Sequence, residues 1–157
     1  MDFRLRDFRP EDLEEVMHIN RTCLPENYTA YFFMSIHRRY PDLFLVAERD
    51  GRIVGYIMCR IERDFMRRRT KGHIISIAVM PEHRRRGIAT ALMKEALARM
   101  MHRYGAGECY LEVRVSNLPA ISLYEKLGFW KDRIVPKYYL DGEDAYIMRK
   151  KLAPDAS

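Results

Sequence analysis

The chain has 157 residues, of which 48% are hydrophobic and 32% are charged. This length provides enough apolar material for one buried core and too little for two comfortable domains. We therefore expect one domain over residues 1–153, followed by a short polar tail at 154–157. The net charge of +6 indicates an acidic partner, which can be a phosphate, a nucleic acid or a carboxylate-rich peptide.

Neither export nor membrane insertion is indicated. The first residues carry a charge every few positions, and no later apolar run approaches the ~18 residues that a membrane span needs. Three cysteines lie far apart without the spacing of a metal site or a redox pair, so we expect buried thiols and no metal. These features predict a cytoplasmic protein with no membrane partner.

The first half of the chain reads as alternating strands and helices. Proline and acidic residues open the first helix, a second proline ends it, and an Asp-Gly pair indicates a hairpin turn. The expected elements are a strand at Phe3 and Leu5, a helix from Pro10, a loop at Leu24–Tyr28, a helix at Tyr31–Arg39, and paired strands at Leu43–Glu48 and Ile53–Glu62. A basic loop at Arg63–Lys71 is expected to follow.

The second half begins with a nearly continuous apolar run, which is typical of a strand buried on both faces at the centre of a sheet. Apolar residues then recur at helical spacing until Gly105. The expected elements are a strand at His73–Val79, a helix at Ile88–His102, a strand at Tyr110–Val115, a helix from Asn117 to Leu127, and strands at Phe129–Val135 and Asp144–Leu152. This order predicts an α/β fold, a mixed sheet with helices on both faces.

The segment Val79–Thr90 joins the central strand to the long helix through a basic loop. Backbone N–H groups in the first turn of a helix lack hydrogen-bond partners within the helix and form the positive end of the helix dipole. They therefore favour a bound anion. Gly87 and Ala89 allow close approach, and three arginines add charge. Phosphate binding is one interpretation, and a solvated basic turn before an ordinary helix is the other.

The stretch Arg84–Ala89 resembles the acetyl-CoA motif of the GNAT acetyltransferases, Q/R-x-x-G-x-G/A. Glu112–Asn117 with Leu123–Phe129 is similar to a second signature of that family. The resemblance implies the GNAT acyl-CoA acyltransferase fold, whose central sheet is mixed and mostly antiparallel, and acetyl-CoA as co-substrate. The positions it implies for acetyl-CoA are Ile77, Ala78, Val79, Arg84, Arg85, Arg86, Gly87, Ile88, Ala89, Thr90, Asn117, Tyr124 and Lys126.

Other stretches resemble the archaeal N-terminal acetyltransferases, a group related to the eukaryotic NatA catalytic subunit and to the bacterial ribosomal-protein alanine acetyltransferase. They are LPENY at Leu24–Tyr28, GH-x-x-S-I-A-V at Gly72–Val79, LEVR-x-SN at Leu111–Asn117, and the segment from Tyr138 through Ala145. The resemblance implies transfer of acetyl to the free α-amino group of protein N-termini. It leaves open an association with the ribosome and the need for an auxiliary subunit.

The resemblance also implies residue roles. Glu112 and His73, on neighbouring strands, would hold a water that takes the proton of the attacking amine, and the phenol of Tyr124 would donate to the sulfur as the thiolate develops. An α-amine has a pKa near ~8 against ~10.4 for lysine, so a modest base suffices. The implied walls of the peptide groove are Leu24, Glu26, Tyr28, Tyr138 and Tyr139.

Other interpretations remain. Each of these residues can instead be structural: a strand-edge histidine, a solvated carboxylate, packed tyrosines, or a helix cap at Asn117. The runs Arg67–Arg69 and Arg84–Arg86 allow a nucleic-acid-binding module, although neither contains interleaved aromatic residues. A partner-dependent or inactive scaffold is a third class. Within the enzyme class, lysine side chains, polyamines and small amines are the alternative acceptors.

Overall fold

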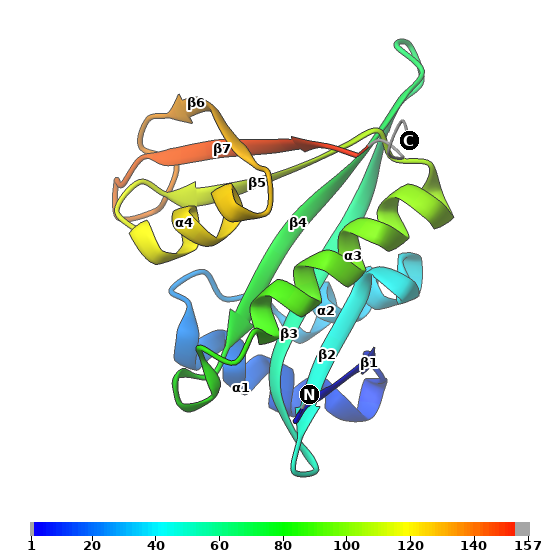
Figure 1. The fold of residues 1–157 in the computed structure, drawn as a ribbon, viewed down its shortest axis with the longest axis vertical. Coiled ribbons are helices and arrows are strands. Elements are labelled where there is room, and N and C mark those ends of the chain that lie inside the picture. Colours follow the sequence, from blue (N-terminus) through cyan, green and yellow to red (C-terminus); the bar gives the residue numbers. More distant parts are fainter. Residues whose placement is uncertain (1, 153–157) are drawn as a thin grey trace.

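The computed structural model describes residues 2–152, which form one seven-stranded sheet in the order β1-β2-β3-β4-β5-β7-β6 (Figure 1). All neighbouring strands are antiparallel except β4 and β5. The strands are β1 (Arg4–Asp7), β2 (Phe44–Arg49), β3 (Arg52–Asp64), β4 (Arg69–Val79), β5 (Glu108–Arg114), β6 (Trp130–Val135) and β7 (Ala145–Lys151). The mixed, mostly antiparallel sheet is confirmed, and the expected tail at 154–157 lies outside the described residues.

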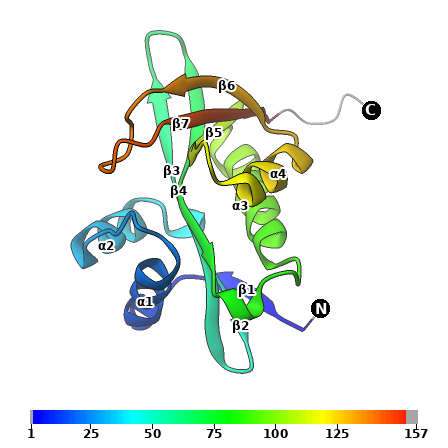
Figure 2. The same cartoon turned by 90° about the vertical axis from the view of Figure 1, so that its left-hand side faces the viewer.

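Helices cover both faces of the sheet. Helices α1 (Leu13–Cys23) and α2 (Ala30–Arg39) lie on one face, and α3 (Ile88–Tyr104) and α4 (Leu118–Lys126) lie on the other (Figure 2). Each face has its own buried apolar cluster. The cluster between the sheet and helices α1 and α2 includes Phe33 and Tyr56, and the cluster between the sheet and α3 includes Leu92 and Met100. Short 3-10 turns at Pro10–Asp12, Pro41–Leu43 and Pro81–His83 each begin at a proline.

The β3–β4 hairpin is longer than the sequence indicates. The predicted basic loop at Arg63–Lys71 was mostly wrong, because Asp64 pairs with Arg69 and the two strands continue to that point. Only residues 65–68 form the turn, with Arg68 at φ 53. Cross-strand pairing therefore extends these charged segments into a projecting finger at the end of the sheet (Figure 2).

Strands β4 and β5 pair over only three residues and then diverge. Their parallel pairing covers Lys71–His73 against Glu108–Tyr110. Gly72 lies in this short stretch, where any Cβ atom would collide with the thioether of Met100, so the glycine allows α3 to pack closely. Beyond His73 the two strands diverge, β4 running towards α1 and β5 towards α4 (Figure 1). One edge of β4 is thereby left without a strand partner along the opening.

Within residues 2–152, no helix combines the length and apolar character needed to cross a bilayer. The same part of the chain contains no cluster of three or more His, Cys, Asp or Glu side chains suited to holding a metal ion. Cys59 and Cys109 are buried free thiols, and burial raises the pKa of both.

Candidate active site

A groove of about 1060 Å³ occupies the opening between β4 and β5. Strands β4 and β5 form the floor of the groove, and α4 forms one side. The loop at 24–28 and the segment at 138–141 enclose one end. Arg84, after β4, and Ala89, in the first turn of α3, add a sixth part of the chain to the lining, so segments far apart in sequence meet where the parallel pairing stops.

The loop predicted to bind an anion, called the anion-binding loop here (residues 84–87), lies where β4 leads into α3. Arg85 and Gly87 both adopt left-handed backbone conformations, at φ 64 and φ 82, and α3 begins directly afterwards. Nε of Arg84 donates to the carbonyl oxygen of Val79 at 2.9 Å and fixes the start of the loop. The four amides of residues 87–90 have no intrahelical partner by the geometry of a helix N-terminus. Open amides, a left-handed glycine and arginines suit a pyrophosphate.

The groove includes about half of the positions expected to contact acetyl-CoA. Ile88 is buried in the core, so only its backbone amide can reach a ligand. Those that line the groove are Ile77, Ala78, Val79, Arg84, Ala89, Asn117 and Tyr124. Those that do not are Arg85, Arg86, Gly87, Ile88, Thr90 and Lys126. Asn117 also caps α4, because its Oδ1 accepts from the amide of Ala120 at 3.3 Å.

Glu112 lines the groove and is in direct contact with His73. Oε1 of Glu112 lies 2.8 Å from Nε2 of His73. His73 is buried behind Glu112 and does not line the groove. A water that serves the reaction must therefore sit on the groove side of Glu112, since no water fits between the two side chains. The expected pair is together, but in this arrangement only the carboxylate faces a substrate.

A second carboxylate, which the sequence did not single out, lies on the other side of His73. Oε2 of Glu62 is 3.2 Å from Nδ1 of His73. The hydroxyl of Tyr110 donates to Glu62 at 2.7 Å, and the Tyr110 ring stacks on the imidazole at 4.3 Å. Burial raises the pKa of Glu62, but the bond from Tyr110 and the nearby positive charges outweigh it, so the pKa is lowered overall. The contact with Glu112 and the stacked ring thus hold the imidazole, and Glu62 places a second negative charge near Nδ1 without the geometry of a hydrogen bond.

Tyr124 presents its phenol to the groove from α4. The side chain is 7% exposed, and burial raises its pKa to about 12. The phenol therefore stays protonated at neutral pH and is available as a hydrogen-bond donor.

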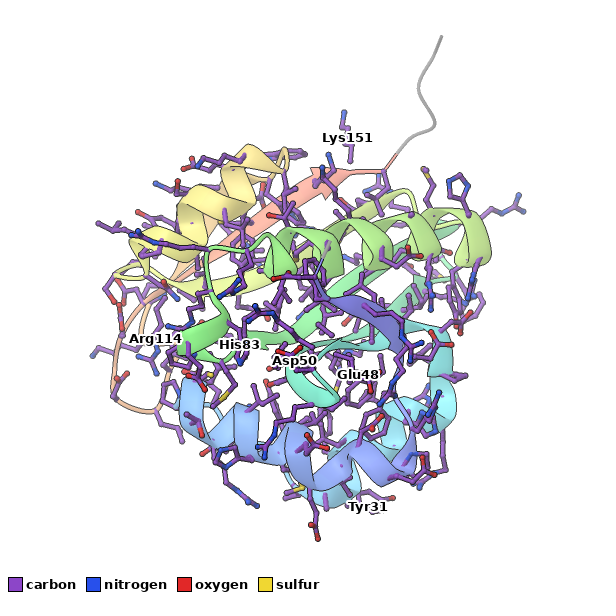
Figure 3. All side chains as sticks on the ribbon, turned by 60° about the horizontal axis from the view of Figure 1, so that its bottom comes forward. Tyr31, Glu48, Asp50, His83, Arg114 and Lys151 are labelled. Atoms are coloured by element: carbon purple, nitrogen blue, oxygen red, sulfur yellow. The ribbon has the colours of Figure 1, made fainter. Side chains whose placement is uncertain are left out.

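The end of the groove that was expected to take the peptide is held together by Arg114, which the sequence analysis also missed. Its guanidinium contacts Glu26 at 2.6 Å, Asp141 at 2.8 Å and Glu143 at 2.9 Å, and lies 4.1 Å from the ring centre of Tyr139. Figure 3 shows Arg114 at the end of the sheet opposite to Lys151. Arg114 thus ties the loop at 24–28 to the segment before β7.

The five expected wall residues all line this end of the groove: Leu24, Glu26, Tyr28, Tyr138 and Tyr139. The two tyrosine rings of the second wall pack edge to face at 5.0 Å. The first wall is shaped by buried Asn20, which donates to the carbonyl of Glu26 at 3.0 Å and accepts from the amide of Tyr28 at 3.2 Å. An asparagine inside an apolar helix face is the sequence signal that could have identified this support.

Known proteins resemble this chain over nearly its whole length. Residues 13–129 match the acetyltransferase (GNAT) family. An N-alpha-acetyltransferase of Saccharolobus solfataricus is 50% identical, over 96% of this chain and 94% of its own. The N-terminal acetyltransferase A complex catalytic subunit NAA10 of Arabidopsis thaliana is 44% identical, over 90% of this chain and 74% of its own. The crystal structure of Chaetomium thermophilum Naa20 in complex with a bisubstrate analogue has a TM-score of 0.87 at 34% identity, over 95% and 86% of the two chains.

Proposed function

Because the chain belongs to the acetyltransferase (GNAT) family, we propose that its groove transfers an acetyl group from acetyl-CoA to the free α-amino group of a protein N-terminus. The observation that carries this proposal is the position of Glu112. Its carboxylate lies in the groove between the anion-binding loop at one end and the Arg114-linked walls at the other. A base is thus available where a thioester held at one end and an amine held at the other would meet.

The residues fit acetyl-CoA, which supplies an activated acetyl thioester when bound. The first-turn amides of α3, with Arg84, Arg85 and Arg86, would hold its phosphates. The unpaired edge of β4 at Ile77, Ala78 and Val79 offers backbone groups to an extended chain of amides. Ala89 is small and lines the groove with Asn117, and Thr90 and Lys126, which lie outside the lining, remain proposed contacts of the cofactor.

Glu112 acts as the general base, directly or through a water on its groove side. Deprotonating an α-amine at neutral pH costs about 1 kcal/mol, against about 4 to 5 kcal/mol for lysine. A carboxylate steadied by one imidazole is sufficient for the first and poorly suited to the second. His73 accepts the proton from Glu112 or holds the carboxylate in place, and in either case it acts from behind the base.

Two hydrogen-bond donors stabilise the negative charge that develops on the carbonyl oxygen and on the sulfur during the reaction. A backbone amide near Val79 stabilises the oxyanion of the tetrahedral intermediate. Tyr124 donates a hydrogen bond to the sulfur as negative charge develops there, and the leaving group departs as a thiolate. Burial suits Tyr124 to this role, because a phenol with a pKa near 12 is protonated at every working pH.

Glu26 faces the substrate from the first wall and receives the amine or the first amide of the peptide. Leu24 and Tyr28 shape the space for the first side chain, and Tyr138 and Tyr139 cover the opposite side. The groove lining includes both proposed walls and the proposed base. We expect an enzyme of the cytoplasm that is active without an auxiliary subunit.

The proposal is tested by steady-state assays with acetyl-CoA and pairs of short peptides that differ only in a free or a pre-blocked N-terminus. The first residue is varied across the set. We expect turnover with free N-termini only, graded by first residue. Equal turnover of blocked peptides that contain lysine, or binding of acetyl-CoA without turnover of any peptide, would overturn the substrate assignment.

The anion-binding loop yields a prediction about affinity. Replacing Arg85 and Arg86 together with Ala is expected to weaken acetyl-CoA binding on the order of 10-fold, because two charge-assisted contacts to phosphate are lost. Isothermal titration at two salt concentrations measures this loss. The matched control removes the exposed arginines Arg9 and Arg52 instead and keeps the affinity. Unchanged affinity in the first variant would contradict the loop's role.

Glu62 yields a prediction about turnover, as a positioning residue for His73. Glu62→Gln is expected to lower kcat roughly 10-fold, since general-base catalysis contributes about 10²- to 10⁴-fold and part of it depends on the imidazole. KM for the peptide should be kept, because Glu62 does not line the groove.

The charged groups around the imidazole are Glu62, Glu112, Arg60, Lys71 and Arg149, with Tyr110 stacked on the ring. Glu108→Gln is the matched control, because Glu108 has similar exposure (28% against 30%) and, among the described residues, forms an ion pair only with Arg149. It should leave kcat and KM in place. A rise in KM that accompanies the fall in kcat for Glu62→Gln would show a structural role only.

A further inference from the structure

The basic finger, residues 63–71 at the end of the β3–β4 hairpin, concentrates positive charge in a short segment. Its nine residues include five cationic side chains and one carboxylate, a net charge of +4 in a chain whose total is +6. The carboxylate, Asp64, accepts from the backbone amides of Met66 and Arg67 and so stabilises the turn. It lies 3.9 Å from the Arg67 guanidinium, a contact too long and exposed to neutralise it.

The other arginines of the finger have no ion-pair partner. Among residues 2–152, no carboxylate oxygen lies within 4.0 Å of the guanidinium of Arg63, Arg68 or Arg69. All three side chains are exposed. By contrast Arg6, Arg99 and Arg114 each contact two or more carboxylates. Like charges concentrated without partners repel one another, which favours a polyanionic ligand at this site.

The tip adds two apolar side chains to these charges. Phe65 is 84% exposed and Met66 is 95% exposed. An exposed ring beside guanidinium groups matches the chemistry of an unpaired base, which offers a flat face for stacking next to phosphates. Two apolar residues on a narrow turn bury too little area to anchor a protein in a bilayer.

The finger is remote from the proposed acetyl-CoA loop. It contains the first residues of β4, whereas the anion-binding loop follows the last residue, Val79. Figure 2 shows the hairpin projecting beyond the sheet. A ligand on the finger would therefore leave the groove open, and no arginine of the finger lines the groove where acetyl transfer is proposed.

We propose that the basic finger is a docking surface for structured RNA, with its arginines on the phosphate backbone and Phe65 against an unpaired base. A nucleic-acid duplex carries a charge about every 1.7 Å along its axis, which an array of fork-shaped guanidinium groups can neutralise at several points at once. This surface holds the enzyme near RNA-rich sites of protein synthesis. The RNA-binding role of the finger does not depend on whether the groove acetylates N-termini.

The test is fluorescence anisotropy of a labelled RNA stem-loop of about 20 base pairs with an unpaired loop, titrated with the protein at several salt concentrations. Saturating CoA keeps the anion-binding loop occupied. We expect salt-dependent binding. The triple variant R67Q/R68Q/R69Q should bind at least 10-fold more weakly, and its slope of log affinity against log salt should fall by about 2 to 3.

The matched control is R9Q/R21Q/R52Q, which removes the same charge from three exposed arginines elsewhere, none of which contacts a carboxylate of the described residues. It should keep the affinity and the slope. Acetyl transfer to a free peptide should be unchanged in both variants, which shows that both are folded. F65A is expected to reduce affinity a few-fold without changing the slope.

Three results would overturn the proposal. The first is equal loss in the two triple variants, which would mean that only the net charge matters. The second is no salt-dependent binding of the stem-loop. The third is finger-dependent binding of phosphatidylserine vesicles or of polyglutamate while binding of the RNA is unaffected by R67Q/R68Q/R69Q.

Discussion

Replacing Glu112 with Gln is expected to lower kcat about 100- to 10,000-fold, the range that a positioned general base contributes. Glutamine keeps the size of the side chain and an oxygen for the contact with Nε2 of His73, which is 2.8 Å in the native protein. It cannot accept the proton of the attacking amine. Acetyl-CoA affinity should stay almost unchanged, because Glu112 lies on β5, away from the anion-binding loop.

Single-turnover kinetics and isothermal titration separate these two effects. Single-turnover rates report on the chemical step, and titration reports on acetyl-CoA binding. Raising the pH deprotonates more of the peptide amine and should partly restore the rate of the variant. If kcat and affinity fall together, or if turnover is unchanged, Glu112 has another role.

Replacing Arg114 with Ala is expected to raise KM for the peptide roughly 10-fold or more while acetyl-CoA affinity is kept. Without the guanidinium, the carboxylates of Glu26, Asp141 and Glu143 repel one another, and the two walls lose their common link. Glu26 is then no longer held towards the groove. Arg114 thus acts as a positioning residue, and the split between KM and kcat is its signature.

Arg99 provides a matched control on the other side of the molecule. Its exposure is 16% against 18% for Arg114, and it contacts Asp7 and Glu95 on the surface near α3. Arg99→Ala should lose a similar amount of stability, about 1 to 3 kcal/mol, without a change in KM. A comparable rise in KM in both variants would mean that general loosening is responsible, and a rise in neither would exclude the linking role of Arg114.

The features that depend on local sequence could be predicted. The turn at Asp50-Gly51, the helix end at Gly105 and the cap at Asn117 are set by backbone preferences of single residues, and the structure has each of them. The strand–loop–helix pattern from Val79 to Thr90 likewise follows from spacing. The chemistry assigned to it came from resemblance to a family, because a basic turn before a helix has several uses.

The features that depend on tertiary pairing could not be predicted. Glu62 reaches His73 because β3 and β4 form neighbouring strands, and Arg114 meets Glu26 across 88 positions of sequence. The periodicity of apolar residues along the sequence does not indicate such long-range contacts. The predicted loop at Arg63–Lys71 was wrong for the same reason, since charged residues of low strand propensity are drawn into the hairpin by their partners.

Regioselectivity tests the central claim most directly. A peptide with a free N-terminus and one internal lysine is incubated with acetyl-CoA and the enzyme, and tandem mass spectrometry locates the acetyl group at early times. The account predicts modification of the α-amine with at least 100-fold preference, consistent with the ~3 kcal/mol difference in deprotonation cost at neutral pH. Equal modification of the two amines, or modification of the lysine alone, would contradict it.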